Sequence, residues 1–453
     1  MSVRLVVENQ RSYFQKDYTR PINFRIRQLR KLKNSLKHNE KVILDALYND
    51  LGKSQMEAYM TELSVVYQEL NEAIKHLKTW ATPKKVKSGL MTMPAKSYIY
   101  QEPYGVTLIL SPWNYPINLT ITPLIGAIAA GNCVVVKPSE TSPHCSRILE
   151  KILNYTFVEE YVHCLPSQTP HDEVNYQNYD YIFFTGSTNV GKEIMSIASS
   201  NLTPVTLELG GKSPAIVDET ANLEISARRL VWAKFINAGQ TCVAPDHILV
   251  HESVKSQLVE KLKDEIKLNY SHAENKDDYP KIINDKHFER LSKLLDEPGL
   301  FGGEINKAAR KIAPALLVDS DFSSPAMDEE IFGPILPIIS YQSLDDLIVK
   351  QRQLAKPLAT YIFTENYETA NYLLEKLSFG GGCINDCLMH LTSSSLPFGG
   401  VGASGMGNYH GKASFNTFSH SKSILKNTSK IDIPIRYLPF NQAKLKILKR
   451  IFS

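Results

Sequence analysis

Residues 97–110 read SYIYQEPYGVTLIL, and this stretch separates two kinds of sequence pattern. Pro103 and Gly105 interrupt it, so it predicts a strand, a tight turn and a second, apolar strand. Before it, from 22 to 80, apolar residues recur at helical spacing. The sequence therefore predicts a helical N-terminal layer that ends shortly before this turn.

Short apolar runs that alternate with helical segments follow the turn. The first series is NCVVVKPSE at 132–140, YDYIFFTGS at 179–187 and SPAIVDE at 213–219. A second series, after residue 242, comprises strand-like runs at 247–250, 335–340, 358–363 and 381–385. Such alternation is typical of parallel sheets covered by helices. Together with the length of 453 residues, it predicts an α/β protein with two lobes.

The net charge is unevenly distributed along the chain. Residues 421–453 hold eight Lys or Arg and one acidic residue, a net charge of +7, whereas the whole chain carries +4. The remainder is therefore slightly acidic, which gives no basis for nucleic-acid binding. In the tail, Leu445, Leu448, Ile451 and Phe452 are interleaved with basic residues. This pattern favours either peripheral contact with an anionic membrane surface or a helix folded against its own dimer.

The six cysteines are spread through the chain, and no two of them have C-x-x-C spacing. This usage is typical of reduced thiols, so we expect a cytoplasmic protein, at most peripheral to the inner face of the membrane. The first residues, MSVRLVVENQRSYF, are neither a signal peptide nor a membrane span. Cys383 and Cys387 lack further partners at zinc spacing, so no metal site is predicted.

Three polar residues in separate motifs are candidates for a nucleophile, a general base and an oxyanion donor. Cys242 lies in GQTCVAP, an irregular loop in which backbone N–H groups can favour the thiolate, although a buried packing thiol is the commoner role. Glu208 ends an apolar strand in TLELGGKSP, where burial suits a general base, and a surface ion pair is the alternative. Asn114, in SPWNYP, either donates to an oxyanion or forms a plain turn.

Two strand ends in the first lobe are candidates for contacts with ribose hydroxyls or phosphate, although the glycine-rich turn lacks the G-x-G-x-x-G fingerprint of a standard dinucleotide site. Lys137 and Glu140 follow the strand in VVVKPSE, at the sheet edge where open α/β proteins bind ligands, although an ordinary surface lysine is the alternative. FFTGSTNVGKE is a glycine-rich turn into a helix, which suits a phosphate. It is close to a P-loop, but Glu193 replaces the Ser or Thr that would bind Mg²⁺, which disfavours an ATPase.

Together these motifs resemble the aldehyde dehydrogenase family, from about residue 25 to residue 421. Seven of them occur in family order: PWNYP, GNCVVVKPSE, FFTGSTNVG, ELGGKSP, GQTCVAP, EEIFGP and LPFGGVGASGMG. Residues 389–420 are most similar to the class 3 branch, which includes fatty-aldehyde enzymes and bacterial enzymes that act on carotenoid aldehydes. The resemblance implies two open, Rossmann-like α/β lobes, a small bridging β hairpin and a homodimer.

The resemblance also implies roles for individual residues. Cys242 would attack the aldehyde substrate, Asn114 and the Cys242 N–H would stabilise the oxyanion, and NAD or NADP would accept the hydride. Glu208 would activate the water that hydrolyses the thioester. The implied cofactor contacts are Lys137 and Glu140 to the adenosine ribose, Gly186, Ser187 and Gly191 to the pyrophosphate, Glu330 to the nicotinamide ribose, and Phe332 to the nicotinamide ring.

The family pattern also divides the chain into ranges. Residues 1–209 would form the NAD(P)-binding domain, with the bridging hairpin at about 90–104, and 210–398 would form the catalytic domain. Residues 399–436 would return to the cofactor lobe and supply a bridging or dimerisation strand. Residues 437–453 would form a basic amphipathic tail.

Two other functions are left open. A CoA-acylating aldehyde dehydrogenase would resolve the thioester with CoA, but such members generally lack the base that Glu208 supplies. An inactive, membrane-associated scaffold would need neither that base nor the nucleophile. The aldehyde, whether medium- or long-chain, aromatic or polyene, is also open. So is the choice between NAD and NADP, because residues 161–180 depart from the family pattern.

Overall fold

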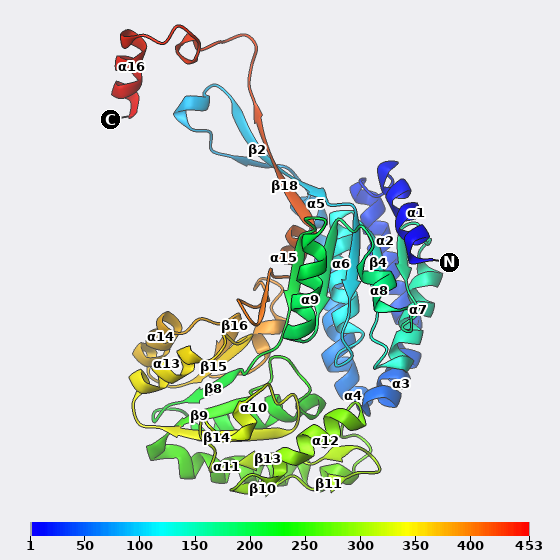
Figure 1. Cartoon of the computed structure of the whole chain (residues 1–453), viewed down its shortest axis with the longest axis vertical. Coiled ribbons are helices and arrows are strands. Elements are labelled where there is room, and N and C mark those ends of the chain that lie inside the picture. Colours follow the sequence, from blue (N-terminus) through cyan, green and yellow to red (C-terminus); the bar gives the residue numbers. More distant parts are fainter. Residues whose placement is uncertain (1, 453) are drawn as a thin grey trace.

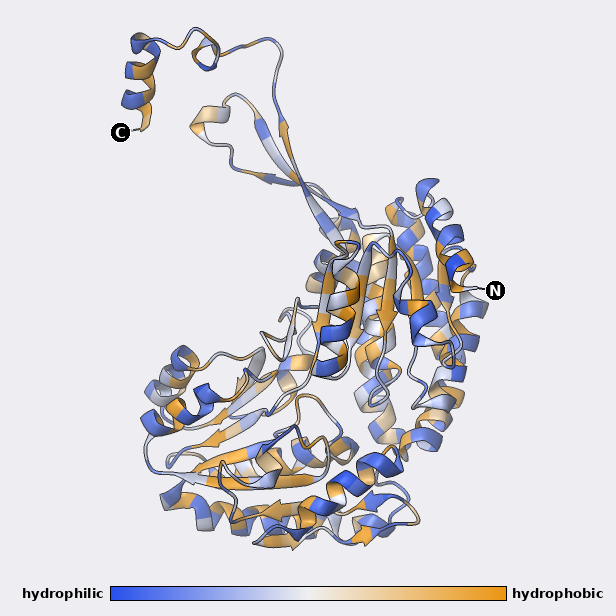
Figure 2. Cartoon of the chain, viewed as in Figure 1, coloured by the Kyte–Doolittle hydropathy of each residue, from blue (hydrophilic) through white to orange (hydrophobic). Residues whose placement is uncertain are grey.

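The structure is a computed structural model that describes residues 2–452, and it contains two α/β units and a protruding arm (Figure 1). The first unit is built on a six-stranded sheet and the second on a seven-stranded sheet. The arm is a three-stranded sheet followed by the C-terminal helix. Figure 2 shows that the apolar residues concentrate on the strands inside both units.

The six-stranded sheet has the order β17-β7-β6-β3-β4-β5, and its strands are parallel except β17. The strands are β3 (Val106–Leu110), β4 (Cys133–Lys137), β5 (Val162–Cys164), β6 (Tyr181–Thr185), β7 (Val205–Glu208) and β17 (Gly405–Met406). Every residue of β3, β4 and β6 is buried, as their continuous apolar runs predict. The chain order reverses beside β3, so the carboxyl ends of these three strands form a crevice suited to a ligand.

Helices pack around this sheet (Figure 1). They are α6 (Asn118–Ala130), α7 (Pro143–Thr156), α8 (His171–Asn175), α9 (Thr188–Ser199) and α15 (Lys412–Thr417). Residues 120–130 of α6 are all buried, because α6 packs against α2, α5 and α15 as well as against the sheet. A helix that is apolar all round must be covered on all sides, which places α6 at the centre of the first unit.

The N-terminal helical layer predicted from 22 to 80 is confirmed. It consists of α2 (Ile22–His38), α3 (Glu40–Leu51), the short α4 (Gln55–Ala58), a π-helical turn (Tyr59–Leu63) and α5 (Ser64–Trp80). A further helix, α1 (Val3–Gln15), precedes it and was not predicted. The buried Gln10 anchors α1 to the first sheet, because its Nε2 donates to the Val134 carbonyl at 2.9 Å and to the Glu159 carbonyl at 3.2 Å.

The seven-stranded sheet has the order β10-β13-β14-β9-β8-β15-β16, and its strands are parallel except β10. The strands are β8 (Pro214–Val217), β9 (His247–His251), β10 (Leu300–Gly302), β13 (Ala315–Leu317), β14 (Ile335–Tyr341), β15 (Ala359–Phe363) and β16 (Gly381–Ile384). The helices of this unit are α10 (Leu223–Phe235), α11 (Glu252–Tyr270), α12 (Asp285–Lys293), α13 (Leu344–Gln353) and α14 (Tyr367–Lys376). A small hairpin of β11 (Ile305–Asn306) and β12 (Lys311–Ile312) lies beside them.

The arm joins two segments that are far apart in the sequence. Strand β2 (Lys96–Pro103) pairs with β1 (Lys84–Val86) on one side and with β18 (Ser419–Lys426) on the other. The arm ends in α16 (Gln442–Phe452), which has no buried residue. The predicted fold class, two open α/β lobes with a bridging hairpin, is therefore confirmed. The bridging sheet begins at Lys84, before the predicted boundary near residue 90.

Candidate active site

A cavity of about 1080 Å³ lies at the carboxyl ends of the six-stranded sheet, where the two units meet. Of the ten predicted site residues, one does not reach it: Gly191 lies inside α9, and an added Cβ there would stand 2.8 Å from Leu209 Cδ2. Gly191 therefore allows the helix to pack closely on Leu209, and its contact with pyrophosphate stays a prediction. The nine that line the cavity are Asn114, Lys137, Glu140, Gly186, Ser187, Glu208, Cys242, Glu330 and Phe332.

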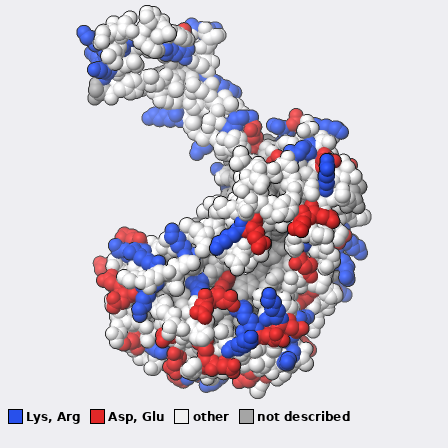
Figure 3. Space-filling model, viewed as in Figure 1, with Lys and Arg blue, Asp and Glu red and all other residues white. Residues whose placement is uncertain are grey.

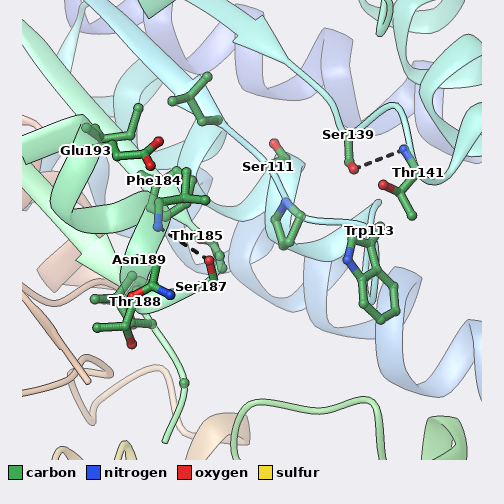
Figure 4. A pocket seen from close by; sticks show the side chains of 18 of the residues that line it. Ser111, Trp113, Ser139, Thr141, Phe184, Thr185, Ser187, Thr188, Asn189 and Glu193 are labelled. Atoms are coloured by element: carbon green, nitrogen blue, oxygen red, sulfur yellow. Dashed lines mark hydrogen bonds between the residues drawn. The ribbon is translucent and has the colours of Figure 1, made fainter. Parts of the chain in front are cut away.

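The turn between β6 and α9 forms one wall of the cavity (Figure 4). Ser187 caps α9, since its Oγ accepts the Val190 N–H at 3.4 Å. An added Cβ at Gly186 would lie 2.5 Å from Phe184 Cζ, so the turn has no room for a side chain. The first N–H groups of a helix and the positive end of its dipole suit a phosphate at this wall.

Lys137 and Glu140 form a second wall, which we call the ribose end of the cavity. The buried Lys137 Nζ donates to Glu140 Oε2 at 3.2 Å and to the Pro138 carbonyl at 3.3 Å. Burial opposes ionisation of Glu140, but its own backbone N–H and the Lys137 ammonium outweigh burial and lower the pKa. His171, from the atypical segment, places Nε2 3.4 Å from Glu140 Oε1. The charges at this end are therefore paired.

Glu208 and Cys242 define the nucleophile end of the cavity. Glu208 is 2% exposed, and neither carboxylate oxygen has a hydrogen-bond partner among the described residues. Its backbone is fixed on both sides, because Glu208 pairs with Thr185 of β6 and with Gly405 of β17. Burial raises the pKa of this carboxyl well above its ordinary value. A carboxylate in such surroundings has the properties of a general base.

The turn before Cys242 has an unusual backbone. Asn237, Ala238 and Gly239 are all left-handed, with φ angles of 53°, 50° and 72°. Non-glycine residues rarely adopt this conformation, which costs free energy and is often found at active sites. The carboxylate of Glu57 supports the turn, because its Oε1 accepts the Asn237 N–H at 2.8 Å. An added Cβ at Gly239 would lie 2.2 Å from a backbone oxygen, so glycine is required there.

Asn114 lies against this turn. Its Nδ2 donates to the Gln240 carbonyl at 3.1 Å, and its own carbonyl accepts from Asn237 Nδ2 at 2.9 Å. An amide nitrogen carries two N–H groups, so Asn114 can donate the second to a ligand oxygen. Asn114 and Cys242 line the same cavity, which brings the predicted oxyanion donor and nucleophile to one site.

The thiol of Cys242 is less acidic than the loop pattern predicts. Burial, followed by the charges of Glu330 and Glu208, raises its pKa to about 12. The N–H groups of Cys242 and Val243 act in the opposite direction, as expected for this loop, but they are outweighed. The N–H groups of the loop therefore favour the thiolate, as predicted, but burial and, after it, the two carboxyl groups have the larger effect on the pKa.

Glu330 and Phe332 enter the cavity from the second unit. Glu330 lies against Gly210, where an added Cβ would stand 2.0 Å from its Oε2. Burial, and after it the charge of Asp246, raises the pKa of Glu330 to about 8. Phe332 has a φ of 49° and meets Trp113 edge-to-face, with 5.5 Å between the ring centroids.

Many other residues that line the cavity were not assigned a role from the sequence, among them Trp113, His287 and Arg290. Trp113 adjoins Asn114 in PWNYP and could have been found from that motif. His287 and Arg290 lie on α12, whose polar residues have the spacing of any amphipathic helix, so nothing marks them. Arg290 supports the adjoining segment, because its guanidinium donates to the Ile331 carbonyl at 2.5 Å.

Comparison with known proteins gives the family. The profile of the aldehyde dehydrogenase family matches residues 2–424. This chain belongs to the aldehyde dehydrogenase family. It is an aldehyde-oxidising oxidoreductase, as the order of the motifs predicts, and the match begins earlier than the predicted start near residue 25. Among residues 2–452, no helix of this aldehyde dehydrogenase is both long and apolar enough to cross a bilayer.

Three relatives and one solved structure align over nearly the whole chain. The 4,4'-diaponeurosporen-aldehyde dehydrogenase of Staphylococcus aureus is 47% identical, over 98% of this chain and 97% of its own length. The dimeric NADP-preferring aldehyde dehydrogenase of Rattus norvegicus is 45% identical over 94% of each chain. The substrate-bound state of Staphylococcus aureus AldH has a TM-score of 0.96 at 46% identity, covering 100% of this chain and 99% of that one. Aldehyde dehydrogenase family 3 member A2 of Macaca fascicularis is 44% identical, over 97% of this chain and 92% of its own length. These similarities confirm the aldehyde dehydrogenase fold and the class 3-like branch.

Proposed function

We propose that this aldehyde dehydrogenase converts an extended apolar aldehyde to the carboxylic acid, with Cys242 as the nucleophile. The observation that carries the proposal is the presence of Cys242, Glu208 and Asn114 on one cavity. A thiol, a buried carboxylate without a partner and an amide donor are the groups that acyl transfer through a thioester needs.

The rest of the cavity fits a dinucleotide. Because Gly186 excludes a side chain, the backbone at the start of α9 is open to a pyrophosphate. Lys137 and Glu140 offer a donor and an acceptor to one ribose, and Glu330 offers an acceptor to the other, next to the ring of Phe332. When bound there, NAD or NADP supplies the hydride acceptor and a positive charge that favours the Cys242 thiolate.

The first chemical step joins the substrate to the protein. The Cys242 thiolate attacks the aldehyde carbon, a C–S bond forms, and the C=O electron pair moves onto the oxygen. The N–H groups of Asn114 Nδ2 and of the Cys242 backbone hold this oxyanion. Loss of the aldehyde hydrogen as hydride restores the C=O bond and leaves a thioester on Cys242.

Glu208 acts in the second step, which releases the product. Its carboxylate takes a proton from water, the resulting hydroxide attacks the acyl carbon, and the C–S bond breaks. The acid leaves and Cys242 returns to the thiolate. The raised pKa makes Glu208 a stronger base than an exposed carboxylate. A CoA-acylating enzyme needs no such base, so the position of Glu208 favours hydrolysis.

The cofactor and substrate proposals rest on different observations. We propose NAD as the cofactor, because the carboxylate of Glu140 at the ribose end would repel a 2′-phosphate. NADP is the alternative, since the rat relative prefers it. For the aldehyde we propose a polyene or long-chain molecule, because the bacterial relative that acts on 4,4'-diaponeurosporen-aldehyde is 47% identical.

A panel of aldehydes tests this function directly. We expect the full-length protein to form NADH or NADPH with aldehydes of increasing chain length, and to release the acid without CoA. Acyl-CoA as the only product would support the acylating alternative, and no reduced cofactor with any aldehyde would support the scaffold. Parallel assays with NAD and NADP at equal concentration give the preference as a ratio of kcat/KM.

We further propose that the arm serves a homodimer and a peripheral contact of this cytoplasmic protein with an anionic membrane surface. Leu445, Ile447, Ile451 and Phe452 of α16 are exposed beside basic residues. In Figure 3 the charged residues on the visible face of the arm are mainly Lys and Arg. The turn before β2 exposes further apolar side chains, Leu90, Met91 and Met93. Apolar and basic groups together favour anionic lipid. The rat relative is named as dimeric, which supports the dimer.

Flotation with vesicles separates the two uses of the tail. We expect the protein to float with vesicles of anionic lipid but not with vesicles of neutral lipid. The double variant Lys446→Gln, Arg450→Gln should float less with the anionic vesicles. Analytical sedimentation should show that this variant remains a dimer. A variant that becomes monomeric would place α16 in the dimer interface instead.

A further inference from the structure

A buried ion pair lies directly behind the proposed oxyanion donor. Lys53 and Glu62 have side chains that are both 0% exposed, and Lys53 Nζ stands 2.9 Å from Glu62 Oε1. Neither residue lines the cavity. We propose that this pair is a positioning device, which holds Asn114 and the Cys242 loop in the geometry that catalysis requires. The proposal rests on the proposed function, because it assumes the role of Asn114.

Lys53 holds the backbone at Asn114. Besides its bond to Glu62, its Nζ donates to the Asn114 carbonyl at 3.0 Å and lies 3.9 Å from the centroid of the Tyr115 ring. An ammonium has three N–H groups, and here two meet oxygen atoms while the ring face receives the remaining charge. The ammonium therefore fixes two consecutive residues, of which the first carries the proposed oxyanion donor.

Glu62 holds the other end of the same segment. Its Oε2 accepts the N–H groups of Ile117 at 3.1 Å and Asn118 at 2.8 Å. Asn118 is the first residue of α6, so the carboxylate satisfies donors at a helix N-terminus and interacts favourably with the helix dipole. Glu62 lies in the π-helical turn between α4 and α5, a local geometry often found at functional sites. One ion pair thus fixes residues 114–118 at both ends.

The same network extends to the nucleophile. The Asn114 carbonyl that accepts from Lys53 also accepts from Asn237 Nδ2 at 2.9 Å, and Asn237 Nδ2 donates to the Gln240 carbonyl at 3.1 Å. Tyr115 OH and Thr241 Oγ1 form a hydrogen bond of 2.6 Å. Thr241 immediately precedes Cys242, so a displacement of the ammonium would move both the oxyanion donor and the nucleophile.

A contribution to fold stability is by itself a weak explanation for the presence of this buried ion pair. Burial of two charges costs a large desolvation free energy, and a buried pair often contributes no more stability than apolar residues of similar volume. A small displacement of reacting groups, in contrast, lowers a reaction rate strongly. The many contacts of Lys53 and Glu62 with residues 114–118 therefore favour a role in positioning.

A double-mutant cycle between Lys53→Met and Asn114→Ala tests the proposal. Methionine keeps most of the side-chain volume without the charge or the donors. We expect Lys53→Met to lower kcat by about 10- to 100-fold while KM for the aldehyde changes by less than about threefold. In the Asn114→Ala background the same substitution should lower kcat by less than about threefold, because the group that it positions is already absent.

Two further variants control the measurement. Glu62→Gln keeps an acceptor for the backbone N–H groups but loses the charge, so we expect the same pattern with a smaller loss of kcat. Lys261→Met removes an exposed ion pair with Glu224, 2.7 Å long, and should leave kcat unchanged. Thermal unfolding and binding of NAD, measured for every variant, show that each variant is folded.

The possible results separate the inference from the proposed function. An unchanged kcat in Lys53→Met, or an equal loss in both backgrounds, would overturn the positioning role. Wild-type activity of Asn114→Ala alone would instead overturn the proposed function. If both Lys53→Met and Glu62→Gln lack a cooperative unfolding transition, the pair is required for folding and the proposal fails.

Discussion

The two ends of the cavity differ in how their charged groups are satisfied. At the ribose end, Lys137 is paired with Glu140, and the pKa of Glu140 is lowered. At the nucleophile end, Glu208 has no hydrogen-bond partner among the described residues, and the pKa values of Glu208 and Cys242 are raised. Paired groups suit binding, whereas perturbed groups without partners suit chemical reaction. Substitutions at the two ends should therefore affect different quantities.

The largest effect is expected at the nucleophile end, from Cys242→Ala. Without the thiol no covalent intermediate can form, so kcat should fall by about 10⁴-fold or more, while the unfolding temperature and NAD binding are kept. Steady-state formation of NADH measures this loss. Cys164→Ala, at a buried thiol of β5, is the matched control and should keep kcat within about twofold. Activity of Cys242→Ala within tenfold of the wild type would show that the chemical step does not depend on the nucleophile end.

Glu208→Gln should have the second largest effect. Loss of the base slows hydrolysis of the thioester, so kcat should fall by about 10²- to 10⁴-fold and the acyl-enzyme should accumulate. Intact-protein mass spectrometry detects the added acyl group on Cys242. The exposed Glu224→Gln is a suitable control. Unchanged turnover in Glu208→Gln would exclude this carboxylate as the base.

The pH dependence of kcat should report the same carboxyl group. Protonated Glu208 cannot accept a proton from water, so kcat should fall about tenfold per unit as the pH drops below its raised pKa. The acidic limb should be absent in Glu208→Gln, whose residual rate is independent of this group. An identical limb in both proteins would assign the titration to another residue.

At the ribose end, Lys137→Met should act on affinity. The ammonium contacts a bound ribose in the proposed function, so KM for NAD should rise about tenfold with kcat within about threefold of the wild type. Initial rates at varied NAD concentration measure both. A fall in kcat at unchanged KM would show that the ribose end takes part in the chemistry, and the contrast would fail.

The smallest effect concerns stability. Burial raises the pKa of Glu208 in the folded state above its ordinary value of 4.5, so the folded state binds more protons than the unfolded chain. The wild type therefore loses stability relative to Glu208→Gln as the pH rises from about 4.5 through the folded-state pKa. We expect Glu208→Gln to be more stable by about 1 kcal/mol at neutral pH, measured by urea unfolding. Equal free energies of unfolding of the two proteins across this pH range would show that ionisation of the buried Glu208 does not destabilise the fold.

The sequence predicts those parts of the site that depend on local pattern. Lys137, Gly186 and Glu208 each stand at the end of an apolar run, and parallel strands bring such ends to one sheet edge. Their convergence on one cavity follows from the alternation of strands and helices. The strained turn before Cys242 is only partly visible, because Gly239 marks it whereas Asn237 does not.

Contacts between distant segments were not predictable in this way. Glu62 has the neighbours of any helical glutamate, and its pairing with Lys53 depends on the π-helical turn. The pKa of Cys242 depends on burial and, after it, on the charge of Glu330, which a different loop supplies. Gly191 has the spacing of a phosphate-binding glycine, yet in space it meets Leu209. In each case the deciding neighbour is set by tertiary packing, which a linear motif does not specify.

The short strand β17 has a consequence for folding of the chain during its synthesis. Gly405 pairs with Glu208, yet it is synthesised only after the entire second unit. Asn132 Nδ2 donates to the Phe418 carbonyl at 2.9 Å, and Phe418 is likewise synthesised after the second unit. The first unit is thus discontinuous in the sequence. In a nascent chain β7 is an unpaired edge strand, which can pair with other chains and promote aggregation. The strand that carries the proposed base therefore gains its second neighbour late in synthesis, so a ribosome that stops before residue 405 leaves a fragment in which β7 lacks β17.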